Sequence, residues 1–291
     1  MGSEQAAGTM RRSIVVLADP DDRGALLVAR SLRLRGAPVA LVATDQLLLA
    51  PVWEHDPLGA SRVVLGNGLE LTDSSIGVLF CRARGVDPPQ FRGAVESDRR
   101  YAQEEFFALL MSWLARLGER VLNRPHPGNL HGTQCSLVED LLSSAWSRGS
   151  PHGFAAASHA RHLPPGAGPV REYRPWGGRF DAGQPAGSGV PGSVVAGGPG
   201  MRLPPLPDGR HWNVTVIGDR LLGGQPPAAA RSLAFRLVRD RGLSFAAIEL
   251  FQLADGGLGH GMIDPFPALD HAGEIEAAAD HLALALSRCV A

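Results

Sequence analysis

Short apolar segments alternate with amphipathic ones near the start of this sequence, an order that few folds can accommodate. Ser13–Ala18 is a β-branched apolar run, and residues 24–35 carry apolar side chains at helical spacing. Two further apolar runs follow, at Pro38–Ala43 and Ile76–Arg82. Strands joined through helices run parallel, because a parallel pair needs a long crossover connection. The sequence therefore predicts an α/β N-terminal domain with a small parallel sheet.

A long helical pattern follows this sheet. It covers Glu96–Leu117 and ends at Gly118, which is a common helix terminator. Its large apolar residues recur every three or four positions, and we expect all of them in the core: Tyr101, Phe106, Leu109, Leu110, Trp113 and Leu117. A second helix is predicted at residues 134–148. We expect the first domain to span residues 1–120.

The middle of the chain has a different composition. Residues 164–207 are dominated by Gly, Pro, Ser and Ala, with too few apolar side chains to offset the entropy of ordering them. We therefore expect residues 121–207 to form a reduced central region with a flexible loop. One aromatic and basic island interrupts this tract, and its residue types dominate binding hot spots. The candidate peptide-binding residues are Arg171, Tyr173, Arg174 and Trp176. The alternative is that the aromatic pair only anchors the loop.

The last third of the sequence favours an α+β domain at residues 208–291. Residues 211–217 alternate as a strand, and residues 221–223 could return as the second strand of a hairpin. Helical patterns at residues 228–241 and 272–290 flank two more predicted strands, at 245–253 and 259–263. Short turns between these strands predict mostly antiparallel pairing.

The composition excludes several classes of protein. All 28 basic side chains are arginine, and the formal net charge is −1. Arginines spread along a neutral chain do not predict nucleic-acid binding. No stretch approaches the ~20 apolar residues that cross a bilayer, and residues 1–12 lack the apolar core of a secretory signal. We therefore expect a cytoplasmic protein without a membrane partner.

Histidines and cysteines give no strong metal signal. Five histidines fall within forty residues of the middle region, at His126, His131, His152, His159 and His162. Loop histidines beside Pro and Gly are usually solvated, and the three cysteines are widely separated. The sequence therefore predicts no metal site.

Several short segments nevertheless carry a resemblance. Val121-Leu122-Asn123-Arg124-Pro125, the strand at residues 211–220, Glu249, Asp255-Gly256 and Met262-Ile263-Asp264-Pro265 together resemble the ATP-grasp superfamily. Within it they are similar to the ligases that modify ribosomally made peptides, the graspetide-type ligases. This resemblance implies an ATP-grasp-like α+β domain that uses ATP and Mg²⁺ to phosphorylate a carboxylate, which an amine or hydroxyl then attacks.

The departures from that pattern fall on charged positions. The resemblance implies two lysines that neutralise phosphate, and this sequence has none. The family's arginine on the hairpin strand is matched by Asn213, its preceding aspartate by His211, and one carboxylate by Met262, a poor Mg²⁺ ligand. Acidic groups remain at Glu249 and Asp264. We therefore interpret His211, Asn213, Glu249 and Asp264 as a vestigial nucleotide and metal site, and we predict no catalytic residue and no bound metal.

These observations lead to three hypotheses. The first is a non-catalytic protein that recognises a precursor or leader peptide in ribosomal peptide natural-product biosynthesis, without a cofactor and in company with other biosynthetic enzymes. The alternative is an active ATP-dependent carboxylate-amine ligase that uses ATP and Mg²⁺, with arginines replacing the lysines. The third is a nucleotide-independent peptide-modifying enzyme. A homodimer is left open.

Overall fold

The structure is a computed structural model, and it describes residues 12–127, 129–132, 155–157, 170–173, 180–182, 200–202 and 209–290. The helix predicted at residues 134–148 lies outside these ranges, as does most of the tract at residues 164–207 for which a flexible loop is predicted. Contacts divide the chain into two compact units. The first joins Met1–Gly132 to Ala268–Ala291, and the second is Thr133–Pro267.

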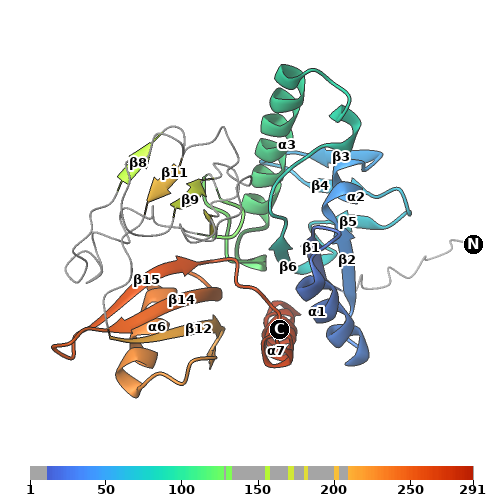
Figure 1. The fold of residues 1–291 in the computed structure, drawn as a ribbon. Helices are drawn as coiled ribbons and strands as arrows, with labels where there is room; N and C mark the ends of the chain where they lie inside the picture. The colour runs from blue at the N-terminus through green and yellow to red at the C-terminus, as the bar shows by residue number, and fades with distance from the viewer. Residues whose placement is uncertain are drawn as a thin grey trace, which may run out of the picture. The chain divides into compact units, whose positions relative to one another are not determined.

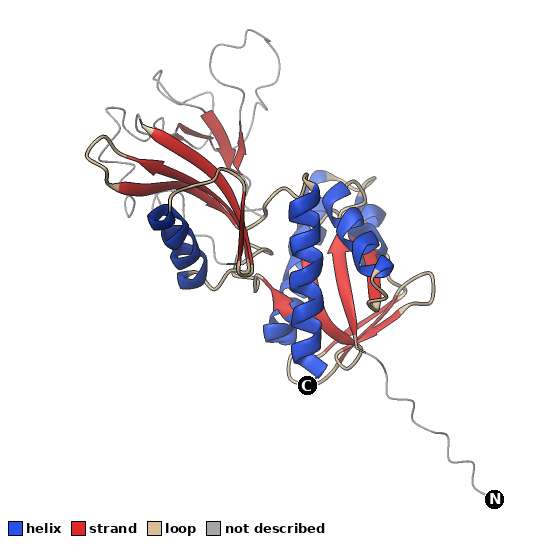
Figure 2. Ribbon diagram, turned by 90° about the horizontal axis from the view of Figure 1, so that it is seen from below, coloured by secondary structure: helices blue, strands red, loops and turns tan. Residues whose placement is uncertain are grey.

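A parallel sheet forms the centre of the first unit. It comprises β1 (Ser13–Ala18), β2 (Val39–Ala43), β6 (Ile76–Arg82) and β7 (Val121–Leu122), in the order β2-β1-β6-β7 (Figure 1). Every pair in it is parallel, which confirms the predicted small parallel sheet. Strand β6 is buried along its whole length, because helices cover both faces of such a sheet (Figure 2).

Three long helices cover this sheet. Helix α1 (Arg23–Leu34) begins at Asp22, whose carboxylate accepts a hydrogen bond from the Ala25 amide. It packs beside α7 (Ala272–Val290), which also contacts β6. Helix α3 (Glu96–Leu117) shares a core with Val15, Leu17 and Leu79 of the sheet.

The core prediction for α3 holds at some positions and is wrong at one. Leu110, Trp113 and Leu117 are buried, whereas Tyr101 is 66% exposed. Phe106 and Leu109 are only half-buried. The helix therefore presents apolar side chains beyond the core that it covers.

A small antiparallel sheet follows β2 in the chain. Helix α2 (Thr44–Leu48) leads into β3 (Val52–His55), β4 (Ser61–Val64) and β5 (Glu70–Thr72), which pair as a meander. Trp53 of β3 meets Trp113 of α3 edge to face, with ring centroids 5.9 Å apart. A 3₁₀ turn, η1 (Pro89–Phe91), precedes α3, and another, η2 (Gly118–Arg120), follows it.

The second unit contains two antiparallel sheets. The first joins β8 (Ala155–Ala157), β9 (Val170–Tyr173), β10 (Phe180–Ala182) and β11 (Gly200–Arg202) in the order β10-β9-β11-β8. These short strands lie within or beside the Gly/Pro-rich stretch whose composition predicts a loop. Low apolar content therefore did not prevent pairing at these positions.

The other sheet confirms the predicted antiparallel α+β pattern. Its strands are β12 (Arg210–Ile217), β13 (Arg220–Leu222), β14 (Phe245–Gln252) and β15 (Leu258–Asp264), in the order β13-β12-β14-β15 (Figure 1). Helix α6 (Ala228–Asp240) covers one face and forms a core there.

Helix α7 belongs to a different unit from the strands that precede it in sequence. The predicted 208–291 domain included this helix, whereas its contacts place it beside α1 and β6 in the first unit. Leu282 and Ala278 of α7 are fully buried. The structure thus divides the last residues differently from the predicted boundary, and the three-part division into 1–120, 121–207 and 208–291 stays a prediction.

Candidate functional site

The predicted vestigial residues lie on one face of the β12–β15 sheet. Alternate residues of a strand point to opposite faces, and Val214, Val216, Ile248 and Leu250 point into the core under α6. The intervening positions therefore belong to the face away from α6. His211, Asn213, Glu249 and Asp264 occupy these positions in β12, β14 and β15.

Asn213 and Glu249 are direct cross-strand neighbours in this face. Side chains at such paired positions are normally about 4.5–5.5 Å apart at Cβ. Glu249 also sits where the β14–β15 register shifts, between Ile248 and Leu250. Its Oε2 accepts a hydrogen bond of 3.1 Å from the Met262 amide, which is part of this bulge. The Glu249 carboxylate therefore binds a main-chain amide of the β-bulge in which Glu249 lies.

Asp264 ends β15 opposite Ala247, two positions along β14 from Glu249. Its Oδ1 accepts a hydrogen bond of 2.9 Å from the Phe266 amide, two residues later. Aspartate side chains often stabilise turns by a hydrogen bond of this kind. The side chains of Glu249 and Asp264 thus both accept hydrogen bonds from main-chain amides in or directly after β15. Within the ranges that the structure describes, no three His, Cys, Asp or Glu side chains are grouped closely enough to hold a metal ion.

Two basic side chains share this face. His211 is exposed and pairs with Phe251. Arg220 of β13 pairs with Ile217, so it lies on the same face near the other end of β12. Arg220 was not among the predicted site residues, although the alternation of side chains along the β12–β13 hairpin places it on this face.

The structure describes only part of the aromatic and basic island. Arg171 and Tyr173 are residues of β9, where the backbone of Tyr173 pairs with Phe180 and that of Arg171 with Ala182. Arg174 and Trp176 lie outside the described residues. The role of these four residues in peptide binding therefore stays a prediction.

Two histidines of the predicted loop cluster have structural contacts. His131 is 3% exposed, and its Nε2 lies 2.8 Å from the carbonyl oxygen of Ala83. The backbone of His126 forms a bridge with Asn129. His152, His159 and His162 lie outside the described residues.

Charged side chains gather in the first unit at the ends of β1 and β6. Arg82 and Asp22 form a pair with an Nε–Oδ2 distance of 2.7 Å, and both side chains are less than a tenth exposed. Arg84 contacts both Asp19 and Asp21. Its hydrogen bond to Asp21 lowers the pKa of that carboxyl, and the same contact raises the pKa of the guanidinium. These pairs join the two loops that follow neighbouring strands.

Two further titratable groups, Cys81 and His260, are buried. Burial raises the pKa of the Cys81 thiol to about 12, so this thiol is not ionised near neutral pH. Burial lowers the pKa of His260, whose Nδ1 lies 2.9 Å from the Gly261 carbonyl oxygen. Neither group has the exposure that a nucleophile or a general base needs.

Sequence comparison gives no match: no family model fits this chain, and no curated protein matches it. Solved structures do match. The macrocyclase MdnC from Microcystis aeruginosa MRC, bound with precursor peptide MdnA, superposes with a TM-score of 0.65 at 13% identity, over 94% of this chain and 99% of its own. The ATP-grasp ligase PsnB, complexed with minimal precursor, Mg and ADP, gives a TM-score of 0.59 at 17% identity, over 94% and 98%. This chain has an ATP-grasp-like fold.

A third solved structure supports the ATP-grasp-like fold. The Chryseobacterium gregarium RiPP-associated ATP-grasp ligase, in complex with ADP and a leader and core peptide, has a TM-score of 0.59 at 11% identity. It covers 94% of this chain and 96% of its own. The resemblance inferred from short motifs is therefore confirmed at the level of the fold. In the described part of this ATP-grasp-like chain, no helix has the length and apolarity to cross a bilayer.

Proposed function

We propose that this chain is a non-catalytic peptide-binding protein with a degenerate ATP-grasp fold. Its partner would be a precursor or leader peptide in ribosomal peptide natural-product biosynthesis. The proposal is supported by the similarity to three structures that were each determined with a precursor, leader or core peptide. Such recognition commonly uses strand addition or a helix in a groove. Cooperation with other biosynthetic enzymes is part of the same proposal.

The chemistry of phosphoryl transfer supports the non-catalytic part. This reaction depends on cations that neutralise the phosphate oxygens and the charge of the transition state. The sequence contains no lysine, so none can act there. On the sheet face that would meet a nucleotide, Asn213 stands opposite Glu249 where the resemblance implies an arginine.

The donor set on this face fits a magnesium triphosphate poorly. Mg²⁺ prefers six oxygen ligands in near-octahedral geometry, and a thioether is a poor substitute. Met262 stands at one carboxylate position and donates its amide to Glu249. Asp264 accepts a hydrogen bond from the Phe266 amide. The observation that carries the proposal is this Asn213–Glu249–Met262 arrangement at the centre of the face, which contributes no basic side chain.

A nucleotide-turnover assay tests the proposal directly. The purified chain is incubated with Mg-ATP and the precursor peptide encoded beside its gene, and released ADP is measured. We expect no peptide-dependent release above that of boiled protein. ADP release that depends on the peptide and disappears in Asp264→Ala would contradict the proposal, provided that the variant keeps its circular dichroism spectrum.

The second candidate is an active carboxylate-amine ligase. The shared face of Glu249, Asp264 and Arg220 favours it, because a guanidinium can pair with phosphate. Under this alternative Arg220→Gln would lower ADP release, and Arg236→Gln on the exposed side of α6 would serve as the matched control.

A further inference from the structure

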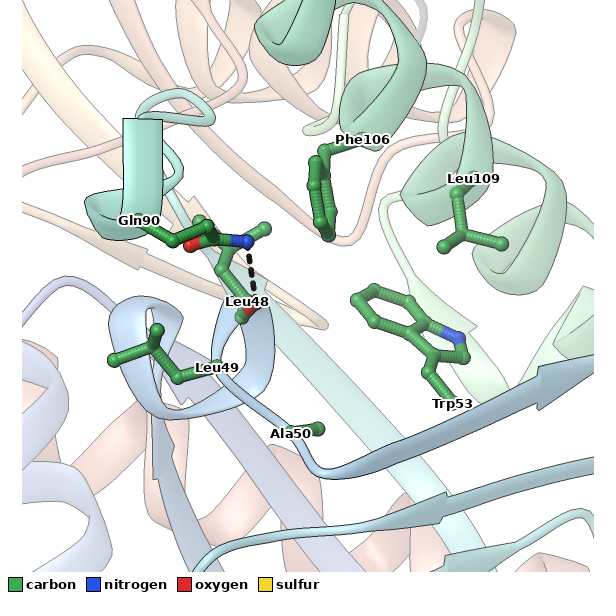
Figure 3. Close-up of a pocket in the computed structure, with 7 residues that line it drawn as sticks. All are labelled: Leu48, Leu49, Ala50, Trp53, Gln90, Phe106 and Leu109. Carbon is green, nitrogen blue, oxygen red and sulfur yellow. Dashed lines mark hydrogen bonds between the residues drawn. The ribbon is translucent and has the colours of Figure 1, made fainter. Parts of the chain in front are cut away.

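An apolar cavity of about 440 Å³ lies in the first unit, whereas the sheet face described above belongs to the second unit. Leu48 of α2, Trp53 of β3, and Phe106 and Leu109 of α3 line it. Figure 3 shows the Phe106 and Trp53 rings pointing toward a common space, with the Gln90 amide held by a hydrogen bond to the Leu48 carbonyl oxygen. Its volume lies in the range of about 300–1,000 Å³ that is typical of ligand pockets.

A second cavity of about 330 Å³ adjoins the first, because Leu48 lines both. Its lining includes residues that follow three parallel strands: Asp19 in the loop after β1, Asp45 in helix α2 directly after β2, and Asp87 in the loop after β6. Strand β1 lies between β2 and β6, so the chain reverses direction across the sheet at this point. In open α/β sheets, ligands bind outside the carboxyl ends of the strands at such a switch point.

The second cavity carries excess negative charge. Asp19, Asp45 and Asp87 line it, with Arg92 as the one guanidinium among its lining residues. Arg84 neutralises Asp19 from outside the cavity, and Asp87 Oδ2 lies 3.5 Å from Arg92 Nε.

Asp45 differs from the other two carboxylates. Its Oδ1 accepts a hydrogen bond from the Gln46 amide, and in the described part of the chain no arginine pairs with it. A cationic group entering this cavity would therefore find an anionic partner that is not already paired with a cation.

We propose that these adjoining cavities bind one peptide segment in which a large apolar side chain stands next to an arginine or lysine. The apolar side chain enters between Trp53 and Phe106, and the cation lies beside Asp45. Aromatic and arginine side chains are the usual anchors of such contacts. This inference rests on the proposed peptide recognition, and it names a docking site for the peptide.

Chemical-shift mapping on the full-length ¹⁵N-labelled chain tests this site. The probe is acetyl-Gly-Ser-Phe-Arg-Ser-Gly-amide, and the comparison peptides replace Phe by Ala or Arg by Glu. We expect the first peptide to shift the indole signal of Trp53 and the amide signals of Leu48 and Gln90. Replacing Phe by Ala should weaken binding about fivefold or more, because a buried apolar side chain is lost. Replacing Arg by Glu should weaken it about twofold or more, because an exposed ion pair is lost and a like charge is added.

Matched variants separate the two halves of the site. Asp45→Asn keeps the oxygen that accepts the Gln46 amide, and it should weaken the Phe-Arg peptide roughly twofold to fivefold. The affinity of the Phe-Glu peptide for Asp45→Asn should be unchanged or slightly higher than for the unsubstituted chain. Glu119→Gln is the control, because Glu119 is 92% exposed and pairs with Arg124 outside both cavities.

Three results would overturn the inference. They are equal shifts by the Phe-Arg and Phe-Glu peptides, no shift at these residues up to millimolar peptide, and shifts caused by diluting the protein alone. The last would mean that a second copy of the chain occupies the cavity. If the precursor peptide still binds while these probes fail, the docking site is wrong and the proposed function stands.

Discussion

The buried Asp22–Arg82 pair should stabilise the first unit through two separable contacts. Asp22 Oδ2 accepts the Arg82 Nε hydrogen bond at 2.7 Å, while Oδ1 accepts the Ala25 amide that begins α1. Because both side chains are less than a tenth exposed, removing one partner leaves a buried charge. Arg82→Met should therefore cost about 3–5 kcal/mol in free energy of unfolding.

Substitutions at Asp22 separate the ion pair from the helix cap. Asp22→Asn keeps a good cap, so it should cost about as much as losing the pair alone, and Asp22→Ala should cost about 1 kcal/mol more. The double variant Asp22→Asn/Arg82→Met removes both charges and should cost at least about 2 kcal/mol less than the sum of the two single variants.

Hydrogen exchange of the β1 and β6 peptides, read by mass spectrometry, gives the opening free energy of this unit. Arg84→Met serves as the control, because the partly exposed Arg84 side chain should contribute only about 0–1 kcal/mol. The reasoning would be refuted if each single variant lowered the free energy of unfolding by less than about 1 kcal/mol and the double variant lowered it by the sum of the two.

Three other predictions follow from burial. Cys81, with a pKa raised to about 12, should resist labelling by a thiol reagent at pH 8 until the chain unfolds, while the partly exposed Cys289 reacts; equal native rates would contradict this. The pKa of His260 is lowered by burial, so the unfolded state binds its proton first as the pH falls; the free energy of unfolding, measured in urea, should drop below about pH 6.5, and less so in His260→Gln. Gly24→Ala should lower the melting temperature, because its Cβ would lie 2.9 Å from the Leu269 carbonyl oxygen, and an unchanged value would contradict that packing.

The parallel sheet could be predicted because its strands are continuous apolar runs. Strands β1 and β6 are buried on both faces, so nearly every residue in them is apolar. Such a continuous apolar run is visible in the sequence without an alternation of apolar and polar residues. The small β3–β5 meander gave no such signal. Its strands are short and carry charged residues such as Glu54 and Arg62 on an exposed side.

Tertiary packing decided what local pattern could not. The apolar spacing of residues 272–290 predicts a helix but not its partner, and the contacts of α7 with α1 and β6 place it in the first unit. Tyr101 fits the helical period of α3, yet it is exposed, so the period alone did not decide which side chains reach the core.

The shared face of His211 and Asn213 was predictable, because these residues alternate along β12 with residues that point into the core. The bulge at Glu249 was not predicted, although the two glycines of β15, Gly259 and Gly261, are typical of such an irregularity. The cavities beside Leu48 could not be found from sequence, since segments far apart in the chain line them.

Calorimetric titration tests most directly whether this ATP-grasp-like chain recognises a peptide without using a nucleotide. Purified protein is titrated with Mg-ATP, and separately with the precursor peptide encoded beside its gene. We expect saturable heat from the peptide and none from Mg-ATP at millimolar concentration. Saturable Mg-ATP binding that Asp264→Ala removes would contradict the central claim, and it would mean that arginines have taken over the phosphate-binding role of lysine.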